Sequence, residues 1–355
     1  MTLCVQFPRT YQEERSYVAR VIFSNFLGLE IKITFSARSN SKIYFRDKRK
    51  QLIILEGLFS TSPSDWLKRK SLPHQPLSVW KLDKISDFLP SPYSSLPVIY
   101  GQDSIKNNFL QSSENQITLR LDIFGSIFFM LTRYEEKVSQ IKDKFERFPT
   151  SASLAYQENF LHRPIVNEYV EVLWTCINQL WPSLKRQTKK FTVSVSHDVD
   201  LPFKYKFVKP TELARKIAKD SIKYGNLKQG LSNFKVWSQV RQGSLEADPF
   251  NTFRWIMDLS DRYGLISAFY FITDCTDLKK DGNYSINSQS VREILRTISC
   301  RGHEIGLHPS FNTYLDPFQT KKEFQRLVQI CNEEGIRQNL WGGRQHYLRW
   351  NNPRT

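Results

Sequence analysis

The stretch Val193-Ser-Val-Ser-His197-Asp198-Val-Asp200 runs from an apolar, strand-like segment directly into three ionisable side chains. Two later stretches repeat this arrangement, Gly302-His303-Glu304-Ile-Gly-Leu-His308 and Gly343-Arg344-Gln345-His346. The whole chain has six histidines, and four of them lie in these three stretches. Imidazole and carboxylate groups gathered at strand ends are typical of a hydrolase that uses a divalent metal.

Strands and helices alternate around the three stretches. We expect strands at residues 191–196, 267–272, 304–307 and 339–341, and helices near residues 210–223, 249–263, 290–299 and 321–334. This alternation predicts parallel strands covered by helices. The three stretches would then meet at the carboxyl ends of neighbouring strands. Asp198 and Asp200 are two residues apart, so both would point to one side of an extended strand.

Residues next to the predicted helices support their ends. Asp248-Pro249 is a suitable cap and first turn for one helix, and Thr320-Lys-Lys-Glu323 matches a capping box for another. Gly264 and Gly335 can end their helices in the left-handed conformation.

Residues 1–190 predict a smaller mixed α/β domain of unknown role. Residues 30–36, 42–45 and 51–57 have the apolar alternation of strands that could pair with one another. Residues 58–118 are rich in Ser and Pro and predict extended structure without long regular elements. A helix capped by Asp122 is expected to run to Glu136, and a second helix to cover residues 166–180. A basic stretch then leads to a domain boundary near residue 190, which leaves residues 191–355 as the second domain.

The chain is strongly basic, with 51 Lys and Arg against 35 Asp and Glu and a formal net charge of +16 over 355 residues. Such a charge favours polyanionic neighbours. The basic residues are spread along the chain and form no known nucleic-acid module. An ordinary solvated basic surface therefore explains the charge better than a specific nucleic-acid site, although charge-driven binding to nucleic acid remains an alternative.

The cysteines and the apolar segments indicate the compartment. Five cysteines without a C-x-x-C pair suggest neither a disulfide framework nor a thiolate zinc site. The N-terminal residues do not resemble a secretory signal, and no run approaches the roughly 18 apolar residues that a membrane span needs. The sequence predicts a cytoplasmic protein without a transmembrane segment, and leaves peripheral membrane association open.

The three stretches resemble the polysaccharide deacetylase family, also called the NodB-homology or carbohydrate esterase family 4 fold, in its branch with a His-Asp-Val-Asp first motif. The resemblance covers about residues 190–355. It implies an α/β fold in which this part of the chain forms a distorted (β/α) barrel. Members of the family continue for several further strands, so the resemblance implies a barrel that is incomplete and truncated at its C-terminus.

The resemblance also implies roles for the residues of the three stretches. It makes Asp198 the catalytic base, Asp200 and His308 ligands of a divalent metal with zinc favoured, and Arg344 the residue that orients the base. The family has a second ligand histidine four residues after the first, where this sequence has Asn312. His346 is the preferred replacement and Asn312 the alternative. The residues expected to support the ligands are His197, His303 and Glu304.

The function implied is the hydrolysis of acetyl groups from N-acetylated or O-acetylated sugars in polysaccharide metabolism, with a carbohydrate substrate. His346 could also protonate the leaving amine, provided that it is not a metal ligand. The alternative is a catalytically inactive relative of the deacetylases that binds a glycan or a partner protein.

Overall fold

The computed structural model describes residues 2–45, 49–81, 93–102, 109–188, 190–224 and 227–352. The chain divides into two compact units. The N-terminal unit holds Met1–Lys144 and Phe148–Lys190, and the C-terminal unit holds Phe145–Arg147 and Phe191–Thr355. The division after residue 190 lies at the expected boundary. The N-terminal unit is the larger of the two, however, and the assignment of Phe145–Arg147 to the C-terminal unit is not indicated by the sequence.

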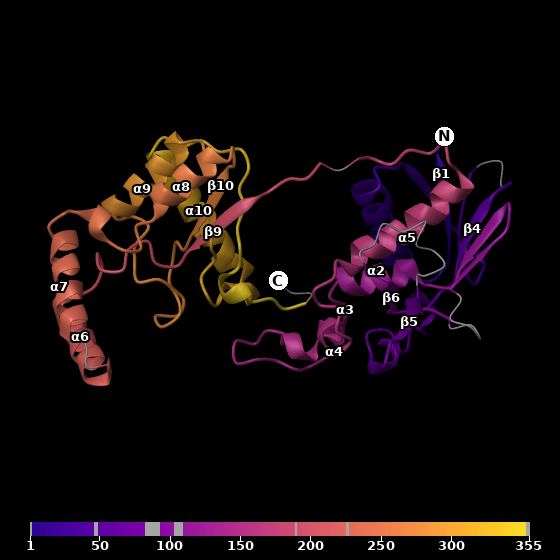
Figure 1. The fold of residues 1–355 in the computed structure, drawn as a ribbon, viewed down its shortest axis with the longest axis horizontal. Helices are drawn as coiled ribbons and strands as arrows, with labels where there is room; N and C mark the ends of the chain where they lie inside the picture. Colours follow the sequence, from indigo (N-terminus) through magenta and orange to yellow (C-terminus); the bar gives the residue numbers. More distant parts are fainter. Residues whose placement is uncertain are drawn as a thin grey trace. The chain divides into compact units, whose positions relative to one another are not determined.

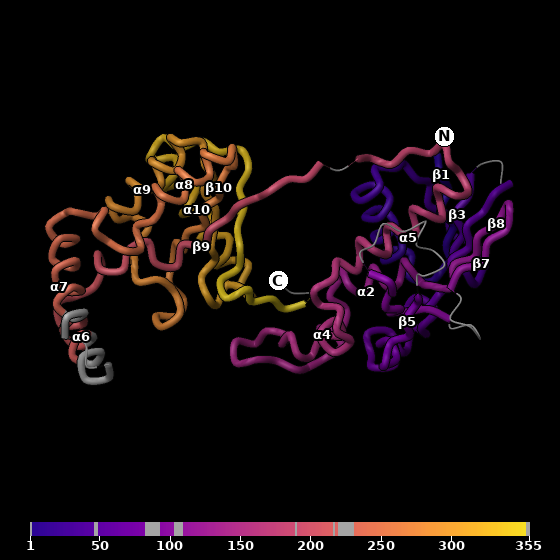
Figure 2. The backbone as a smooth tube through the Cα atoms, viewed as in Figure 1, coloured from indigo at the N-terminus to yellow at the C-terminus, as the bar shows by residue number. Residues whose placement is uncertain are grey.

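The N-terminal unit is built on a six-stranded mixed sheet with the order β2-β1-β3-β4-β8-β7. Its parallel pairs are β1 with β2 and β4 with β8, and its other pairs are antiparallel. Figure 2 shows β7 and β8 side by side. A separate two-stranded sheet pairs β5 with β6. The strands are β1 (Leu3–Pro8), β2 (Ile31–Ser36), β3 (Ser41–Tyr44), β4 (Gln51–Ile54), β5 (Ser78–Lys81), β6 (Ser95–Val98), β7 (Leu110–Ser112) and β8 (Gln116–Leu119).

Helices α1 (Gln12–Arg20), α2 (Ile123–Leu131) and α5 (Ile165–Leu180) pack with this sheet, and the π-helix η1 (Val21–Phe26) continues α1. Figure 1 shows α2 beside α5. Asp122 caps α2 as expected, because its carboxylate accepts a hydrogen bond from the Gly125 amide at 2.8 Å. The helix ends earlier than expected, since Arg133 adopts a left-handed conformation that separates α2 from the short α3 (Tyr134–Val138). The four-residue α4 (Leu154–Gln157) lies between α3 and α5.

One expectation for the N-terminal unit needs correction. The predicted strands 30–36 and 42–45 do not pair with each other, because β1 lies between β2 and β3. Strand β1, in which Leu3, Val5, Phe7 and Pro8 are buried, takes the position inside the sheet. The described part of residues 58–118 agrees with the expectation of extended structure without long regular elements, because strands β5 to β8 have only three or four residues each. Part of this region, residues 82–92 and 103–108, lies outside the described residues.

The C-terminal unit is built on a parallel three-stranded sheet with the order β11-β10-β9. Helices α8 (Phe253–Arg262), α9 (Gln289–Cys300) and α10 (Pro317–Glu333) share an apolar core with the sheet, as expected (Figure 1). The strands are β9 (Val195–Val199), β10 (Ser267–Phe271) and β11 (Glu304–Leu307). Gly264 and Gly335 end α8 and α10 with φ of 64° and 72°. The unit is thus of the α/β type, and the described residues form no closed barrel.

Helices α6 (Pro210–Tyr224) and α7 (Leu227–Arg241) follow β9 and precede α8 in the sequence, and they pack against each other. The sequence predicted α6 but not α7. A separate small apolar cluster, with Tyr205, Leu213 and Val240 buried, lies at this pair. Figure 1 shows α6 and α7 set off to one side of the three-stranded sheet. No helix in the described part of the chain has the length and apolarity that a membrane span requires.

The first and last predicted strands of this unit are placed differently. The first strand begins at Val195 rather than at Phe191, whose side chain is 92% exposed. His197 and Asp198 therefore lie within the strand. Residues 339–341 form no strand, because the side chain of Gln338 takes the edge of β11. Its Oε1 accepts from the Ile305 amide at 2.9 Å, and its Nε2 donates to the Ile305 carbonyl at 2.7 Å.

Two predicted caps have other roles. Asp248 does not cap α8, which begins at Phe253, and its carboxylate instead accepts from the amides of Lys204 and Tyr205 at 2.8 Å each. Helix α10 begins before the predicted capping box and is capped by Asp316. Glu323 is buried within α10 and accepts from the amide of Ser310 at 2.9 Å. Both carboxylates join segments that are distant in sequence.

Candidate metal centre

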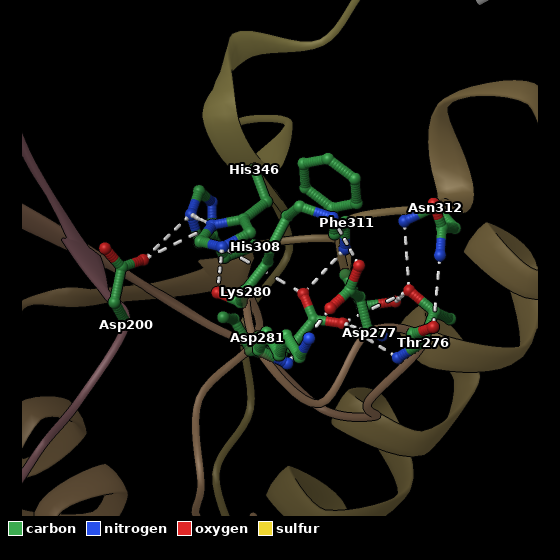
Figure 3. Close-up of polar contacts among 12 residues, drawn as sticks. Asp200, Thr276, Asp277, Lys280, Asp281, His308, Phe311, Asn312 and His346 are labelled. Atoms are coloured by element: carbon green, nitrogen blue, oxygen red, sulfur yellow. Dashed lines mark hydrogen bonds and ion pairs between the residues drawn. The ribbon is translucent and has the colours of Figure 1, made fainter. Parts of the chain in front are cut away.

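Three predicted ligand residues lie together in the C-terminal unit. Asp200 directly follows β9, His308 directly follows β11, and His346 begins the short turn η7 (His346–Leu348). One ligand atom from each residue lies within 4.8 Å of the other two. Figure 3 shows the carboxylate facing the two imidazole rings. Both histidines are buried, whereas the Asp200 side chain is 59% exposed, so the group is open to solvent on the carboxylate side.

The backbone of neighbouring segments assigns the ring nitrogens. His308 Nδ1 lies 2.5 Å from the Arg344 carbonyl oxygen, and His346 Nε2 lies 2.9 Å from the Lys280 carbonyl oxygen. A carbonyl oxygen only accepts hydrogen bonds, so these two nitrogens carry the protons. The remaining nitrogens, Nε2 of His308 and Nδ1 of His346, then present lone pairs when the rings are neutral.

Those two nitrogens lie 2.7 Å apart, at 3.2 Å and 3.4 Å from Asp200 Oδ1. Three acceptor atoms therefore face one another, an arrangement that needs a positive charge between them. A proton on one ring or a bound cation would supply it. Two imidazoles and one carboxylate, each of the imidazoles oriented by a carbonyl, match the ligand set of a catalytic zinc site with open positions.

The pKa shifts agree with this electrostatic picture. Hydrogen bonds that the protonated rings of His308 and His346 donate to Asp200 hold the pKa of its carboxyl well below its usual range. Burial acts to lower the pKa of His346, but the hydrogen bonds to Asp200 and to the Lys280 carbonyl raise it by more. The cluster favours an ionised carboxylate beside positive charge.

Asp198 and Arg344 lie beside this cluster. Arg344 Nη1 donates to Asp198 Oδ1 at 2.9 Å, and Nη2 donates to Ser196 Oγ at 2.5 Å. Asp198 Oδ1 also lies 3.9 Å from His308 Nδ1, so Asp198 and Asp200 both face His308 as the spacing predicted. The guanidinium lies over the ring of Tyr270, 5.5 Å from its centroid. The contact between Arg344 and Asp198 is the one that the resemblance implies, while the catalytic roles stay predictions.

His197 and His303 contact Ser267 of the neighbouring strand β10 and not the three ligand residues. His197 Nε2 lies 3.0 Å from Ser267 Oγ, and His303 Nδ1 accepts from the Ser267 amide at 3.2 Å. His303 Nε2 faces Asp261 at 3.3 Å. His197 points to the face of β9 opposite Asp198, because side chains alternate along a strand. Burial lowers the pKa of both histidines.

The remaining two candidates do not join the cluster. Asn312 donates to the Thr276 carbonyl at 3.0 Å and accepts from Arg349 at 3.2 Å, so it lies away from His308 (Figure 3). Of the two alternatives, His346 lies with Asp200 and His308 and Asn312 does not, while the role of His346 as a ligand stays a prediction. Glu304 opens β11 and is half-buried, and within the described residues its side chain has no hydrogen bond to the three ligand residues.

A loop that the sequence did not indicate supports His346. The buried carboxylate of Asp281 accepts from the amides of Thr276, Asp277 and Phe311 at 2.7 to 2.8 Å. These bonds shape the loop that brings the Lys280 carbonyl to His346 (Figure 3). Asp281 Oδ1 itself lies 3.9 Å from His346 Nε2. The Asp281-Gly282 pair is a turn signal that could have drawn attention to this segment.

Residues Phe145 and Arg147 contact Tyr347, which in turn contacts His346. The ring of Tyr347 contacts those of His346 and Phe145 at 4.6 and 4.8 Å between centroids. Arg147 donates to the Tyr347 carbonyl at 2.9 Å. Tyr347 has a φ of 57°, so the turn that carries His346 is held in an unfavourable backbone conformation by these contacts.

Comparison with known families identifies the N-terminal unit. Residues 3–182 match the model of a family of unknown function, DUF7033. Since the match covers just over half of the chain, the protein belongs to this family. Searches of the curated proteins and of the solved structures found no match.

Proposed function

We propose that this protein is a metal-dependent carbohydrate deacetylase, which removes acetyl groups from N-acetylated or O-acetylated sugars, and that its C-terminal unit has a fold of the NodB type. The observation that carries the proposal is the meeting of Asp200 Oδ1, His308 Nε2 and His346 Nδ1 as three acceptors beside the Asp198–Arg344 pair. The resemblance of the three stretches to the polysaccharide deacetylases supplies the reaction.

In this proposal Asp200, His308 and His346 hold a divalent cation, with zinc favoured by the two imidazoles. When bound, such a cation acts as a Lewis acid that lowers the pKa of water and stabilises negative charge on a carbonyl oxygen. Asp198 takes a proton from the attacking water. Arg344 orients the Asp198 carboxylate toward the cluster through its hydrogen bond at 2.9 Å.

The hydrogen bonds of His346 bear on which group protonates the leaving amine. One ring nitrogen of His346 donates to the Lys280 carbonyl and the other faces Asp200 and His308. Because both ring nitrogens are engaged in this way, His346 serves as a ligand in this proposal and not as the general acid. Asp198, protonated in the first step, returns that proton to the amine as the bond between carbonyl carbon and nitrogen breaks.

The first test is the metal content of the purified chain, measured by elemental analysis. We expect about one equivalent of zinc or another divalent ion per chain in the wild type and a large loss in His308→Ala. His162→Ala, which removes an exposed imidazole of the N-terminal unit, is the matched control and should keep the ion. A folded wild-type protein that takes up no divalent ion would contradict the proposal and leave a binding protein without hydrolase activity.

The second test is acetate release from acetylated sugars such as oligomers of N-acetylglucosamine. Asp198→Asn should keep the ion and lose at least about 100-fold in rate, because a general base contributes a factor of this size. A protein that binds the ion but releases acetate from no acetylated sugar would have the metal site without the proposed reaction, and would contradict the deacetylase assignment.

A further inference from the structure

Helices α6 and α7 carry an unusual share of the charge. Residues 204–241 contain ten Lys and Arg but two Asp and Glu, a net charge of +8 by this count, which is half of the +16 of the whole chain. These 38 residues are about a tenth of the sequence. Half of the net positive charge therefore lies on this helical pair and the six residues that precede it, and is not spread evenly along the chain.

Apolar side chains on α7 accompany this charge. Leu231 is 72% exposed and Phe234 is 54% exposed. They are three residues apart, so they lie on one side of the helix. Val240 of the same helix is fully buried in the small cluster with Tyr205 and Leu213. Helix α7 thus buries Val240 in this cluster and leaves Leu231 and Phe234 exposed.

Exposed basic side chains accompany Leu231 and Phe234 in this region of the chain. Lys235 follows Phe234 directly, and Arg241 ends α7 with its guanidinium 5.9 Å from the centroid of the Trp237 ring. Lys209, which directly precedes α6, and Arg215 in α6 are also exposed. An amphipathic helix that combines Lys and Arg with exposed Leu and Phe is suited to lie in the interface of an anionic bilayer.

We propose that α6 and α7 bind the surface of a membrane that contains anionic lipids. Basic side chains near such a surface are attracted to lipid headgroups, and the attraction is screened by salt. Leu231 and Phe234 would enter the boundary between headgroups and acyl chains. Nucleic acid could attract the same charge, but it offers no apolar phase for these two side chains, so the exposed leucine and phenylalanine favour lipid. The proposal is independent of the deacetylase activity.

Vesicle flotation with the full chain tests this proposal. We expect binding to vesicles made of equal parts phosphatidylcholine and phosphatidylglycerol, and little binding to pure phosphatidylcholine. Leu231→Ser/Phe234→Ser should weaken binding by about 10-fold or more, since each side chain loses apolar burial. Leu278→Ser/Phe318→Ser removes the same two side-chain types from positions that are 93% and 84% exposed in this unit, and should bind as the wild type does.

Circular dichroism of both double variants checks that they are folded. Failure of the folded wild type to bind the anionic vesicles would overturn the proposal, as would equal binding to the neutral ones. Binding that is lost in high salt, is unchanged in Leu231→Ser/Phe234→Ser and is matched by retention on duplex DNA would also overturn it. That result would show a general polyanion surface without insertion into lipid.

Discussion

Gly282 lies against the backbone of Asp200, so closely that a β-carbon at residue 282 would be 2.2 Å from the Asp200 carbonyl oxygen. The same β-carbon would be 2.8 Å from the ring of Tyr284, whose hydroxyl donates to the Val199 carbonyl at 3.0 Å. The end of β9, which positions Asp200, is therefore packed against a glycine that permits this approach. The segment of residues 280–284 contacts both sides of the proposed metal centre, through the Lys280 carbonyl and through Gly282.

Gly282→Ala should move Asp200 away from the two histidines. We expect the free energy of unfolding to fall by about 1–3 kcal/mol, because the added carbon meets backbone that must shift. Divalent-metal affinity, measured by competition with a chelating dye, should fall as well. Gly264→Ala is the control, because it strains a left-handed residue with no neighbour within 4 Å of the added carbon. The control should lose stability but keep its metal affinity.

Asp281→Ala should weaken metal binding without removing a ligand. The substitution takes the acceptor from three backbone amides and frees the loop that directs the Lys280 carbonyl to His346. We expect metal affinity to fall by about 10- to 100-fold, as for other residues that orient a ligand. Asp277→Ala, on the same loop, should have a smaller effect. Asp281→Asn retains one acceptor oxygen and should lie between them, and equal affinities in all three variants would contradict the supporting role.

Arg344→Lys should keep the charge but lose the two-point contact with Asp198 and Ser196, since a lysine cannot reproduce the guanidinium geometry. If Asp198 is the base, the turnover number for acetate release should fall by up to about 100-fold with little change in metal content. Arg337→Lys, at an exposed position, is the control. A wild-type rate in Arg344→Lys would show that the orientation of Asp198 does not limit the reaction.

Asp122 should make the stability of the N-terminal unit depend on pH. Burial, followed by the charge of Glu56, raises the pKa of Asp122 to about 7 from its ordinary 3.8. The folded state then binds this proton more tightly than the unfolded state does. The stabilisation is complete below the ordinary pKa and is lost as pH rises through about 7. Urea unfolding between these values should show a decline in the wild type.

In Asp122→Asn this decline should be smaller, because residue 122 no longer titrates. The variant should also be less stable by about 1–2 kcal/mol at low pH. Both carboxyl oxygens of Asp122 accept from backbone amides, and the amide nitrogen that replaces one of them cannot accept a hydrogen bond. A wild-type pH slope in the folded variant would assign the effect to another group.

Gln338→Ala should destabilise the edge of β11. The variant removes the partners of the Ile305 amide and carbonyl, which should cost about 1–3 kcal/mol. Hydrogen exchange at the Ile305 amide should be faster than in the wild type. Gln329→Ala, which loses only an exposed contact with Glu333, should leave this exchange unchanged.

The sequence predicted the elements whose pattern is local. Strand 304–307 agrees with β11, and the helix expected near residues 290–299 agrees with α9. Alternation alone could not show where β9 begins, because Phe191 is as apolar as a strand residue but is exposed. The fold class of the C-terminal unit followed from alternation, whereas the absence of a closed barrel in the described residues depends on pairing between distant strands.

The candidate site was predictable where the residue type carries the chemistry. Asp200, His308 and His346 could be named as candidate ligands because few side-chain types suit a metal and because the family resemblance implies a metal site in these stretches. The contribution of Lys280 is a backbone carbonyl, which every residue has, so no sequence pattern marks it. The sequence could not show that His197 and His303 contact Ser267. A histidine with such a contact cannot be distinguished by sequence from one that supports a metal ligand.

The three ligand residues are distant in sequence, and each is anchored to a different part of the C-terminal unit. A cation held among them would act as a reversible cross-link between the start, the middle and the end of this unit. Such a cross-link stabilises the native state in proportion to the logarithm of the cation concentration. The melting temperature of the C-terminal unit would therefore rise with the concentration of the ion. When the ion is scarce, the fraction of folded protein would fall.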